Sequence, residues 1–141
     1  MSDDDALRAE TAPVPELTEA ERAYLASQPL ARLATAKPDG RVDVAPVGFR
    51  FDGHRIVVGG YDITKTMKFF NVRTNPRAAI VIDDLASTEP WTPRGIKFHG
   101  SARIIDDGEG RAAIEIVPDR KWSWGINRPA FDGAGPAQDR S

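Results

Sequence analysis

The amino-acid sequence predicts a single mainly β domain, a small antiparallel barrel of about six short strands with two or three helices at its edges. Two observations favour this fold class. The apolar residues fall into short runs, several of which alternate with polar residues as in half-buried strands. Turn-forming Pro, Asp and Gly residues separate most of these runs, as expected for strands joined by tight turns and not by the long crossovers of a parallel sheet. A barrel also leaves no sheet edge exposed.

Composition excludes several classes of protein. The chain of 141 residues has the length of one ordinary domain, and its net charge of −2 argues against the broad basic face of a nucleic-acid-binding protein. It has no cysteine, which rules out disulfides, thiolate zinc sites and a cysteine nucleophile, so redox chemistry would need a bound cofactor. No apolar run approaches the roughly 20 residues of a membrane span, and the acidic N-terminus does not resemble a secretory signal. We therefore expect a cytoplasmic protein with no membrane segment and no nucleic-acid partner.

Changes in composition along the chain predict three segments. Residues 1–16 carry few large apolar side chains and are expected to form a disordered arm. Residues 17–127 hold the alternating and apolar runs and are expected to form the folded domain. Residues 128–141 are rich in Gly, Pro and Asp and are expected to form a flexible tail.

The domain is expected to open with a helix at residues 18–28, followed by a β-hairpin. Thr18 and Glu21 have the spacing of a capping box, which is typical of a helix N-terminus. Two strands, at residues 30–37 and 41–51, should come next. The Pro-Asp-Gly sequence between them favours a tight turn, so the two strands should pair.

A third strand and a second helix are predicted in the middle of the chain. The strand, residues 55–60, follows an Asp-Gly turn and should pair with the second strand. The helix is expected at residues 64–74, where Asp62 or Thr64 can cap its first turn. An Asn-Pro pair should end it, because proline disfavours a helical conformation in the residue before it.

The second half of the chain is expected to add strands, one loop and one short helix. Gly100 lies within an alternating stretch and suggests a β-bulge or a close approach of two backbones. Trp122 and Trp124 are two residues apart in the last strand and should share one face, which could belong to the core, contact a cofactor or seal a subunit interface. The expected elements are a strand at 77–84, a loop at 85–95, a strand at 96–106, a polar turn with a short helix at 106–117, and a strand at 120–126.

Lysines stand where the second predicted helix should begin. Lys65 and Lys68 are three residues apart and should share one helical face, while Met67 and Phe70 pack elsewhere. The amide dipoles already place partial positive charge at a helix start, so each cation there should cost about 0.3 to 1 kcal/mol unless an anion offsets it. The amides, the two ammonium groups and the Thr64 hydroxyl could therefore bind a phosphate. Two solvated lysines would give the same pattern.

Proline and glycine mark a second candidate region. Pro46 and Gly48 lie in a strand predicted to be central, where proline removes a ladder hydrogen bond and glycine removes a side chain. A flat ring laid against the backbone of residues 45–48 would explain both choices, and so would an edge strand with a bulge. Gly60 belongs to a Gly-Gly pair that would let the backbone approach a ligand closely, although such pairs are also common in turns.

Other catalytic patterns are missing from the sequence. His54 and His99 are far apart and have no metal-ligand spacing. No nucleophile elbow surrounds a serine, and no Gly-x-Gly-x-x-Gly sequence marks a dinucleotide site. We expect no metal site and no covalent catalytic residue.

Four stretches of the chain, taken in order, resemble a known family, the split β-barrel flavin and deazaflavin oxidoreductases, also called pyridoxamine 5′-phosphate oxidase-like proteins. The resemblance covers roughly residues 17–127. The second stretch fits the family pattern K-x-x-N-[LV]-x-x-[ND]-P-R-[VA], and the last two resemble the actinobacterial branch that uses the deazaflavin coenzyme F-420. The stretches are LARLATAKPDGRVDVAPVGFRFDG (30–53), KFFNVRTNPRAAIVIDD (68–84), PWTPRGIKFHGSARI (90–104) and SWGI (123–126).

The resemblance implies a fold, a cofactor and an activity. The fold is a six-stranded antiparallel split β-barrel (the FMN-binding split barrel), mainly β with peripheral helices, that forms homodimers with two cofactor sites at the interface. The cofactor is coenzyme F-420, with FMN as the alternative. The activity is hydride transfer between the cofactor and a small organic electron acceptor; an FMN-binding oxidoreductase of the same fold and a non-catalytic cofactor-binding protein remain alternatives. The chain lacks the C-terminal Arg-Leu-x-Pro segment of pyridoxamine phosphate oxidases, so that specific activity is not expected.

The resemblance also implies which residues bind the cofactor. Lys68 matches the family lysine that faces the cofactor phosphate, and Gly60, Thr64 and Lys65 lie in the same phosphate-side loop. Trp124 matches a tryptophan that in relatives can approach the cofactor site across the dimer. The strand that lines the cofactor ring matches Ala45, Pro46, Val47 and Gly48.

Overall fold

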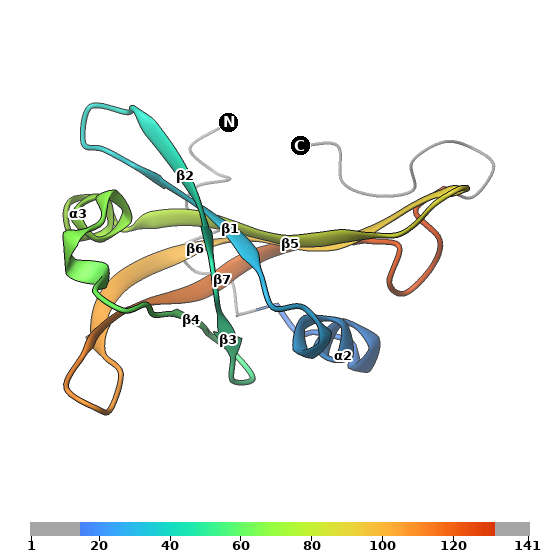
Figure 1. The fold of residues 1–141 in the computed structure, drawn as a ribbon, viewed down its shortest axis with the longest axis horizontal. Coiled ribbons are helices and arrows are strands. Elements are labelled where there is room, and N and C mark those ends of the chain that lie inside the picture. Colours follow the sequence, from blue (N-terminus) through green and yellow to red (C-terminus); the bar gives the residue numbers. More distant parts are fainter. Residues whose placement is uncertain (1–14, 132–141) are drawn as a thin grey trace.

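Seven antiparallel strands form one curled sheet in the computed structural model, which describes residues 15–131. The strand order is β2-β1-β5-β6-β7-β4-β3, with helix α3 at one end of the sheet and helix α2 near the other (Figure 1). The predicted mainly β fold with peripheral helices is confirmed, with seven strands instead of six. The strands are β1 (Ala31–Ala36), β2 (Val42–Val47), β3 (Arg50–Phe51), β4 (Ile56–Val58), β5 (Arg77–Thr88), β6 (Trp91–Asp106) and β7 (Ala112–Trp124), and the helices are α2 (Glu19–Ser27), the 3-10 helix η1 (Ile63–Lys65) and α3 (Met67–Thr74).

The capping box predicted for the first helix is present. The Thr18 hydroxyl accepts a hydrogen bond from the Glu21 amide at 3.1 Å, and the Glu21 carboxylate accepts one from the Thr18 amide at 2.8 Å. These two bonds satisfy amide groups that the helix itself leaves without partners. The side chains of Tyr24 and Leu25 from this helix are buried in the core, and this packing holds α2 against the end of the sheet.

The predicted second strand is broken into two. β2 ends at Val47, and the chain resumes as β3 after Gly48 and Phe49. β2 lies at an edge of the sheet, so the prediction of a central strand is wrong and the edge alternative is right. An edge strand tolerates Pro46, because one side of its backbone forms no ladder hydrogen bonds. β4 pairs with β3 and β7, so the third predicted strand meets only the last part of the second.

A long hairpin replaces the loop predicted at residues 85–95. β5 continues to Thr88 and β6 begins at Trp91, so only a tight turn separates them. The prolines and turn formers of this stretch indicated a loop, but the ladder accommodates irregular residues where its register shifts after Leu85.

The short helix predicted within residues 106–117 is replaced by the start of β7. A turn closed by the hydrogen bond from the Asp107 amide to the Arg111 carbonyl, at 2.8 Å, leads into this strand. β7 pairs with β6 on one side and β4 on the other, and its Ile114 and Ile116 are fully buried. Pairing on two sides outweighs the weak local helix propensity.

Gly100 lies at a β-bulge, as predicted. The register of β6 against β7 shifts between His99 and Gly100. A Cβ atom on Gly100 would lie 2.4 Å from the carbonyl oxygen of Val117, so a larger residue would have to displace a neighbouring strand. The glycine therefore permits the close approach of two backbones in the middle of the sheet.

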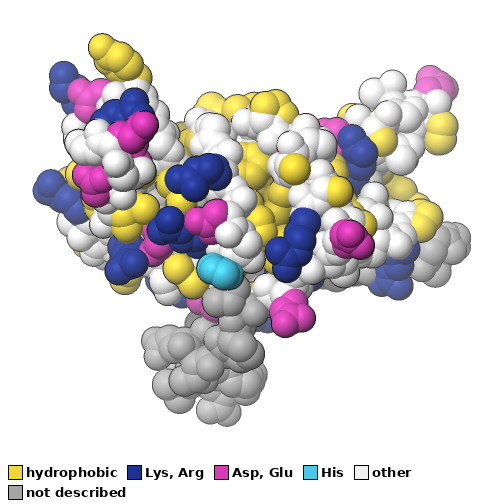
Figure 2. Space-filling view, turned by 90° about the horizontal axis from the view of Figure 1, so that it is seen from below, with side chains coloured by type: hydrophobic (Ala, Val, Ile, Leu, Met, Phe, Trp, Pro, Cys, Tyr) yellow, Lys and Arg dark blue, Asp and Glu magenta, His cyan; other side chains and the backbone are white. Residues whose placement is uncertain are grey.

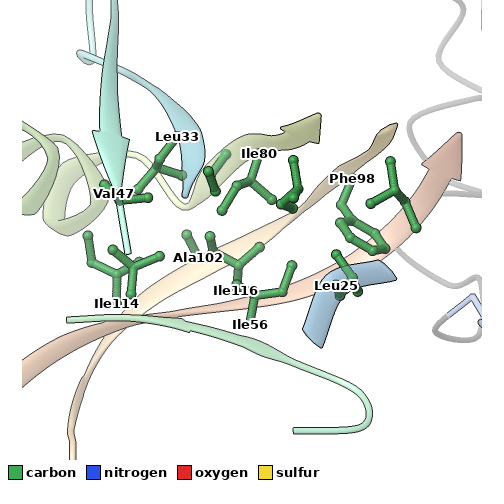
Figure 3. Packing of buried hydrophobic residues seen from close by; sticks show 14 of the residues in the cluster. Leu25, Leu33, Val47, Ile56, Ile80, Phe98, Ala102, Ile114 and Ile116 are labelled. Atoms are coloured by element: carbon green, nitrogen blue, oxygen red, sulfur yellow. The ribbon is translucent and has the colours of Figure 1, made fainter. Parts of the chain in front are cut away.

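The core lies on one face of the curled sheet. Side chains from the sheet and from α2 point toward one another there (Figure 3). Burying a large aliphatic or aromatic side chain stabilises the fold by about 1.5 to 3 kcal/mol. Because strand residues alternate, the residues between these lie on the opposite, outward face. The inward-pointing residues include Leu25, Leu33, Val47, Ile56, Ile80, Phe98, Ala102, Ile114 and Ile116.

The surface in Figure 2 carries Lys and Arg side chains mixed with Asp and Glu, and they do not gather into one basic area on this face. Among the described residues, no helix has the length and apolar character needed to cross a bilayer. The predictions of a disordered arm and a flexible tail fall mostly on residues 1–14 and 132–141, which lie outside the described residues.

Candidate functional site

Helix α3 starts later than the sequence indicated, and its cap is Thr66. The Thr66 hydroxyl accepts a hydrogen bond from the Phe69 amide at 3.4 Å and donates one to the Ile63 carbonyl at 2.6 Å. The prediction that Thr64 or Asp62 caps this helix is therefore wrong. Threonine occurs twice just before the helix, and the sequence gives no reason to prefer Thr66, because the intervening 3-10 turn is a tertiary feature.

The two lysines of the predicted phosphate site have different surroundings. Lys65 lies in η1, before the cap, with a side chain that is 83% exposed and an ammonium group 3.5 Å from Asp62. Lys68 lies in the first turn of α3 and is half-buried. Within the described part of the chain, Lys68 has no hydrogen-bond or ion-pair partner. Only one of the two cations therefore stands at the helix start without a counter-charge.

Thr64 and Lys65 are joined to Asp62. The Thr64 hydroxyl donates a hydrogen bond to the Asp62 carboxylate at 2.6 Å. This bond and the charge of Lys65 lower the pKa of Asp62. The three side chains form a local, exposed cluster in which the negative charge is already balanced.

The two apolar side chains of α3 that pack in the core differ from the two that were predicted to do so. Met67 and Phe70 are 49% and 47% exposed, whereas Phe69 and Val72 are buried. Because the helix begins three residues later than expected, the helical face that carries Phe69 packs against the sheet. The ammonium group of Lys37 lies over the Phe70 ring, 5.7 Å from its centroid.

Two of the predicted glycines line one hollow. Gly48 and Gly60 border a cavity of about 560 Å³ between the β2–β3 bend, the turn after β4 and the β6–β7 turn. No atom lies within 4 Å of the position that a Cβ would take on either glycine, so both backbones are open to this space. Arg50, Asp107 and Arg111 supply charges of both signs to its walls.

The strand before Gly48 can present its backbone, but few side chains, to a ligand. Val47 is 6% exposed and belongs to the core. Pro46 is exposed on the opposite face, and Ala45 is half-buried. Any ligand ring lying here would meet the edge-strand backbone of residues 45–48.

Trp124 ends β7 at the other end of the sheet from α3. It pairs with Gly95, and a Cβ on Gly95 would lie 2.5 Å from the Trp124 ring, so the indole lies across the glycine. The hydroxyl of Tyr24, from α2, bonds the neighbouring Arg94 carbonyl at 3.2 Å, which places this site beside α2. Figure 1 shows α2 and α3 at opposite ends, so one chain does not bring Trp124 to Lys68.

Trp122 lies on the same outward face as Trp124, as predicted. Its ring is 4.6 Å from that of His99, and Lys97 and Arg120 lie over it at 4.7 and 5.2 Å. Both tryptophans are half-buried and lie outside the core, so the core interpretation of this pair is wrong. Partial burial and the positive charges of Lys97 and Arg120 lower the pKa of His99.

A buried carboxylate holds the end of β7 to α2. Glu21 is 1% exposed and accepts hydrogen bonds from Lys121 and Ser123, both at 2.7 Å, and from Asn127 at 3.2 Å. Burial alone would raise the pKa of Glu21, but the bonds from Lys121, the Thr18 amide and Ser123 together lower it. We call the group of Glu21, Thr18, Lys121, Ser123 and Asn127 the Glu21 clasp.

Comparison with known proteins identifies a matching family and a similar enzyme. The family model described as pyridoxamine 5′-phosphate oxidase matches residues 17–127. A 5a,11a-dehydrotetracycline/5a,11a-dehydrooxytetracycline reductase of Streptomyces rimosus is 36% identical over 119 residues, which cover 77% of this chain and 83% of that protein.

Solved structures share the fold. An F420 reductase has 23% identity and a TM-score of 0.57, over 77% of this chain and 98% of its own. An FAD-binding protein of Mesorhizobium loti has 16% identity and a TM-score of 0.61, over 76% and 93%. The reductase relative and the family match support the predicted oxidoreductase class of enzyme. The chain therefore belongs to the pyridoxamine 5′-phosphate oxidase family.

Proposed function

We propose that this protein is a reductase that uses coenzyme F-420 to reduce a small organic acceptor. The observation that carries the proposal is Lys68, a half-buried cation in the first turn of α3 with no acidic partner in the described part of the chain. A phosphate group is the anion that a helix start and an ammonium group bind together. The S. rimosus relative is named a reductase, which supports the direction of the reaction.

The residues present fit a phosphorylated, flat cofactor. Lys68 would bind the phosphate, and the open backbone at Gly60 would allow the chain to approach it closely. Thr64 and Lys65 flank this loop and would contribute less, because Asp62 already pairs with both. The ring would lie along the edge-strand backbone of Ala45, Pro46, Val47 and Gly48.

The chain's contribution to such a reaction is binding and orientation. When bound, a reduced deazaflavin supplies a hydride, and the acceptor gains a further proton from water to complete a two-electron reduction. The protein would hold the acceptor face to face with the ring and exclude water from between them. No side chain needs to form a covalent bond.

A cofactor titration tests the proposal against its nearest alternative. FMN on the same fold is favoured by the similarity to an FAD-binding protein. Fluorescence quenching measures the affinity of the purified protein for F-420 and for FMN under identical conditions. We expect the protein to bind F-420 more tightly than FMN. Tighter binding of FMN would reject F-420 as the cofactor.

A second measurement separates an enzyme from a binding protein that stores or senses the cofactor. Reduced F-420 is mixed with the protein and a panel of quinones and enones. Saturable oxidation of the cofactor is expected. Binding without turnover on the whole panel would favour the non-catalytic alternative.

We also propose that the protein acts as a homodimer. Val42 and Val44 of the edge strand are 81% and 65% exposed, and β1 presents Ala36 and Ala34 opposite them. An apolar sheet face of this kind is typical of a surface that another subunit covers. A second copy would also allow Trp124 of one chain to approach the cofactor of the other.

A further inference from the structure

A second hollow of about 560 Å³ lies at the end of the sheet near α2. It forms between Trp91–Pro93, at the start of β6, and Gly125–Phe131, the segment after β7. We call it the C-terminal hollow. Its volume falls in the range of about 300 to 1,000 Å³ that is typical of small-molecule sites.

The walls of the C-terminal hollow combine apolar and polar groups and include two aromatic rings. Trp91 is 61% exposed and Phe131 is 48% exposed. Ile126 and Pro129 add apolar surface, and the polar groups come from Thr92, Asn127 and Arg128. Large aromatic side chains left open to solvent around a cavity are typical of a site that stacks a flat ring.

Gly125 presses one wall of the hollow against the sheet. Its φ angle is +68°, a left-handed conformation that glycine adopts without strain. A Cβ at this position would lie 2.2 Å from the Pro93 carbonyl oxygen and 2.9 Å from the Arg94 Cα. The segment after β7 therefore packs directly on the backbone of β6, and the two walls have a fixed separation.

The Glu21 clasp holds the same wall from the other side. The Asn127 amide donates to Glu21 at 3.2 Å, and the Asn127 oxygen accepts from the Thr18 hydroxyl at 2.7 Å. Because Glu21 is buried and is also bonded to Lys121 and Ser123, Asn127 has a fixed position. A hollow whose wall is held at two points loses little freedom when a ligand binds.

The C-terminal hollow lies next to a smaller hollow beside Trp124 and shares lining residues with it. A smaller hollow of about 100 Å³ is lined by Trp124 and Ser123, and it shares Gly125 and Asn127 with the larger one. Trp124 is the residue expected to approach the cofactor. A molecule in the C-terminal hollow would therefore extend toward that tryptophan.

We propose that the C-terminal hollow binds the acceptor substrate, and that this substrate is a flat compound with at least one aromatic or quinone ring and a polar substituent. Stacking between Trp91 and Phe131 would hold the ring, and the Thr92 hydroxyl would bind a polar substituent. The assignment of the ligand as a substrate rests on the proposed function, whereas the site itself depends only on the hollow.

Binding of menadione to the protein without cofactor tests the site. Backbone amide NMR shifts locate the ligand, and calorimetry gives its affinity. We expect shifts centred on residues 91–92 and 125–131. Trp91→Ala and Phe131→Ala should each weaken binding about three- to tenfold, the effect of losing one aromatic contact. Leu30→Ala is the control, because Leu30 is 43% exposed and does not border the hollow, and it should not change the affinity.

The outcomes separate the site from the proposed function. Shifts on another face, no binding, or unchanged affinity in both aromatic variants would overturn the site. A change of oligomeric state in Trp91→Ala, measured by sedimentation, with no loss of menadione affinity would make Trp91 a subunit contact and would overturn its role in the site. If the protein binds menadione but neither F-420 nor FMN, the proposed function is rejected, whereas the proposed ligand site in the C-terminal hollow is still supported.

Discussion

At the start of α3, the ammonium group of Lys68 stands without an acidic partner among residues 15–131. If it binds the cofactor phosphate, Lys68→Ala removes a charge-assisted hydrogen bond worth about 1.5 to 3 kcal/mol, so the affinity for F-420 should fall about 10- to 100-fold. The free energy of unfolding should change by less than about 0.5 kcal/mol, because no bond within the protein is lost. Fluorescence titration and urea unfolding measure the two quantities.

Lys65 provides the matched control for this variant. Its side chain is 83% exposed and already pairs with Asp62. Lys65→Ala should therefore weaken cofactor binding less than about threefold, since an exposed ion pair contributes little. Equal losses in the two variants would mean that both lysines act only through general attraction of an anion, and would contradict a specific role for Lys68.

A second residue-scale prediction concerns Gly125. Gly125→Ala places a Cβ 2.2 Å from the Pro93 oxygen, at a φ of +68°. We expect a loss of about 2 to 4 kcal/mol in unfolding free energy, from the left-handed conformation and the overlap together.

Gly40 separates these two causes. It has a φ of +93° and no atom within 4 Å of a built Cβ. Gly40→Ala should cost only about 1 kcal/mol, from the conformation alone. Urea unfolding of both variants makes the comparison, and equal losses would show that the overlap at Gly125 relaxes without cost.

At the scale of elements, the Glu21 clasp joins α2 to β7 and makes stability depend on pH. The pKa of Glu21 is lowered in the folded state, so its contribution is present above the pKa of the unfolded chain and is lost as the pH falls through the folded value. Glu21→Gln should cost about 2 kcal/mol at pH 7, because Lys121 loses its charged partner.

The difference between wild type and Glu21→Gln should shrink as the pH falls below the ordinary pKa of glutamate, because the unfolded chain then takes up a proton that folded Glu21, with its lowered pKa, binds less readily. Urea unfolding between pH 7 and pH 3 measures it. Glu19→Gln, on an exposed position of the same helix, should show no such trend. A difference that stays constant with pH would mean that the carboxylate charge does not stabilise the clasp.

At the scale of the whole molecule, the outward face of the sheet is expected to be the dimer interface. Val44→Glu places a charge on a side chain that is 65% exposed in one chain and would be buried between two. We expect the dimer to dissociate at least tenfold more readily, with little change in the stability of the subunit, because an unpaired buried charge is costly.

Sedimentation or light scattering at several concentrations measures the dissociation. Leu30→Glu makes the same change outside β2, since Leu30 is 43% exposed and lies between α2 and β1. A monomeric wild type would contradict the homodimer. A dimer that Val44→Glu leaves intact would place the interface elsewhere.

The sequence predicted well where local chemistry decides the structure. The Thr18–Glu21 capping box and the bulge at Gly100 both follow from short patterns and are present. It failed where strands pair over long distances. The residues 85–95 carry loop formers, and 106–117 carry weak helix formers, yet both lie largely in long strands because their neighbours complete the ladder.

The candidate site divides in the same way. The sequence alone marked Lys68, Gly48 and Gly60, because a cation at a helix start and backbone without side chains are visible in local patterns. It placed Lys65 on the same helix, whereas the chain forms a 3-10 turn there and starts α3 after Thr66. The C-terminal hollow had no local signal, since its two walls are more than thirty residues apart in the chain.

The sequence by itself determined the class of fold, the turns at residues 38–40 and 52–53, the first helix and the absence of cysteine chemistry, because each depends on residues close together in the chain. Only the tertiary structure decided that β2 is an edge strand and that Trp124 lies far from Lys68 in one chain. These features depend on which strands pair and on how strongly the sheet curls, and such long-range choices are set by the packing of the whole core and not by any one segment.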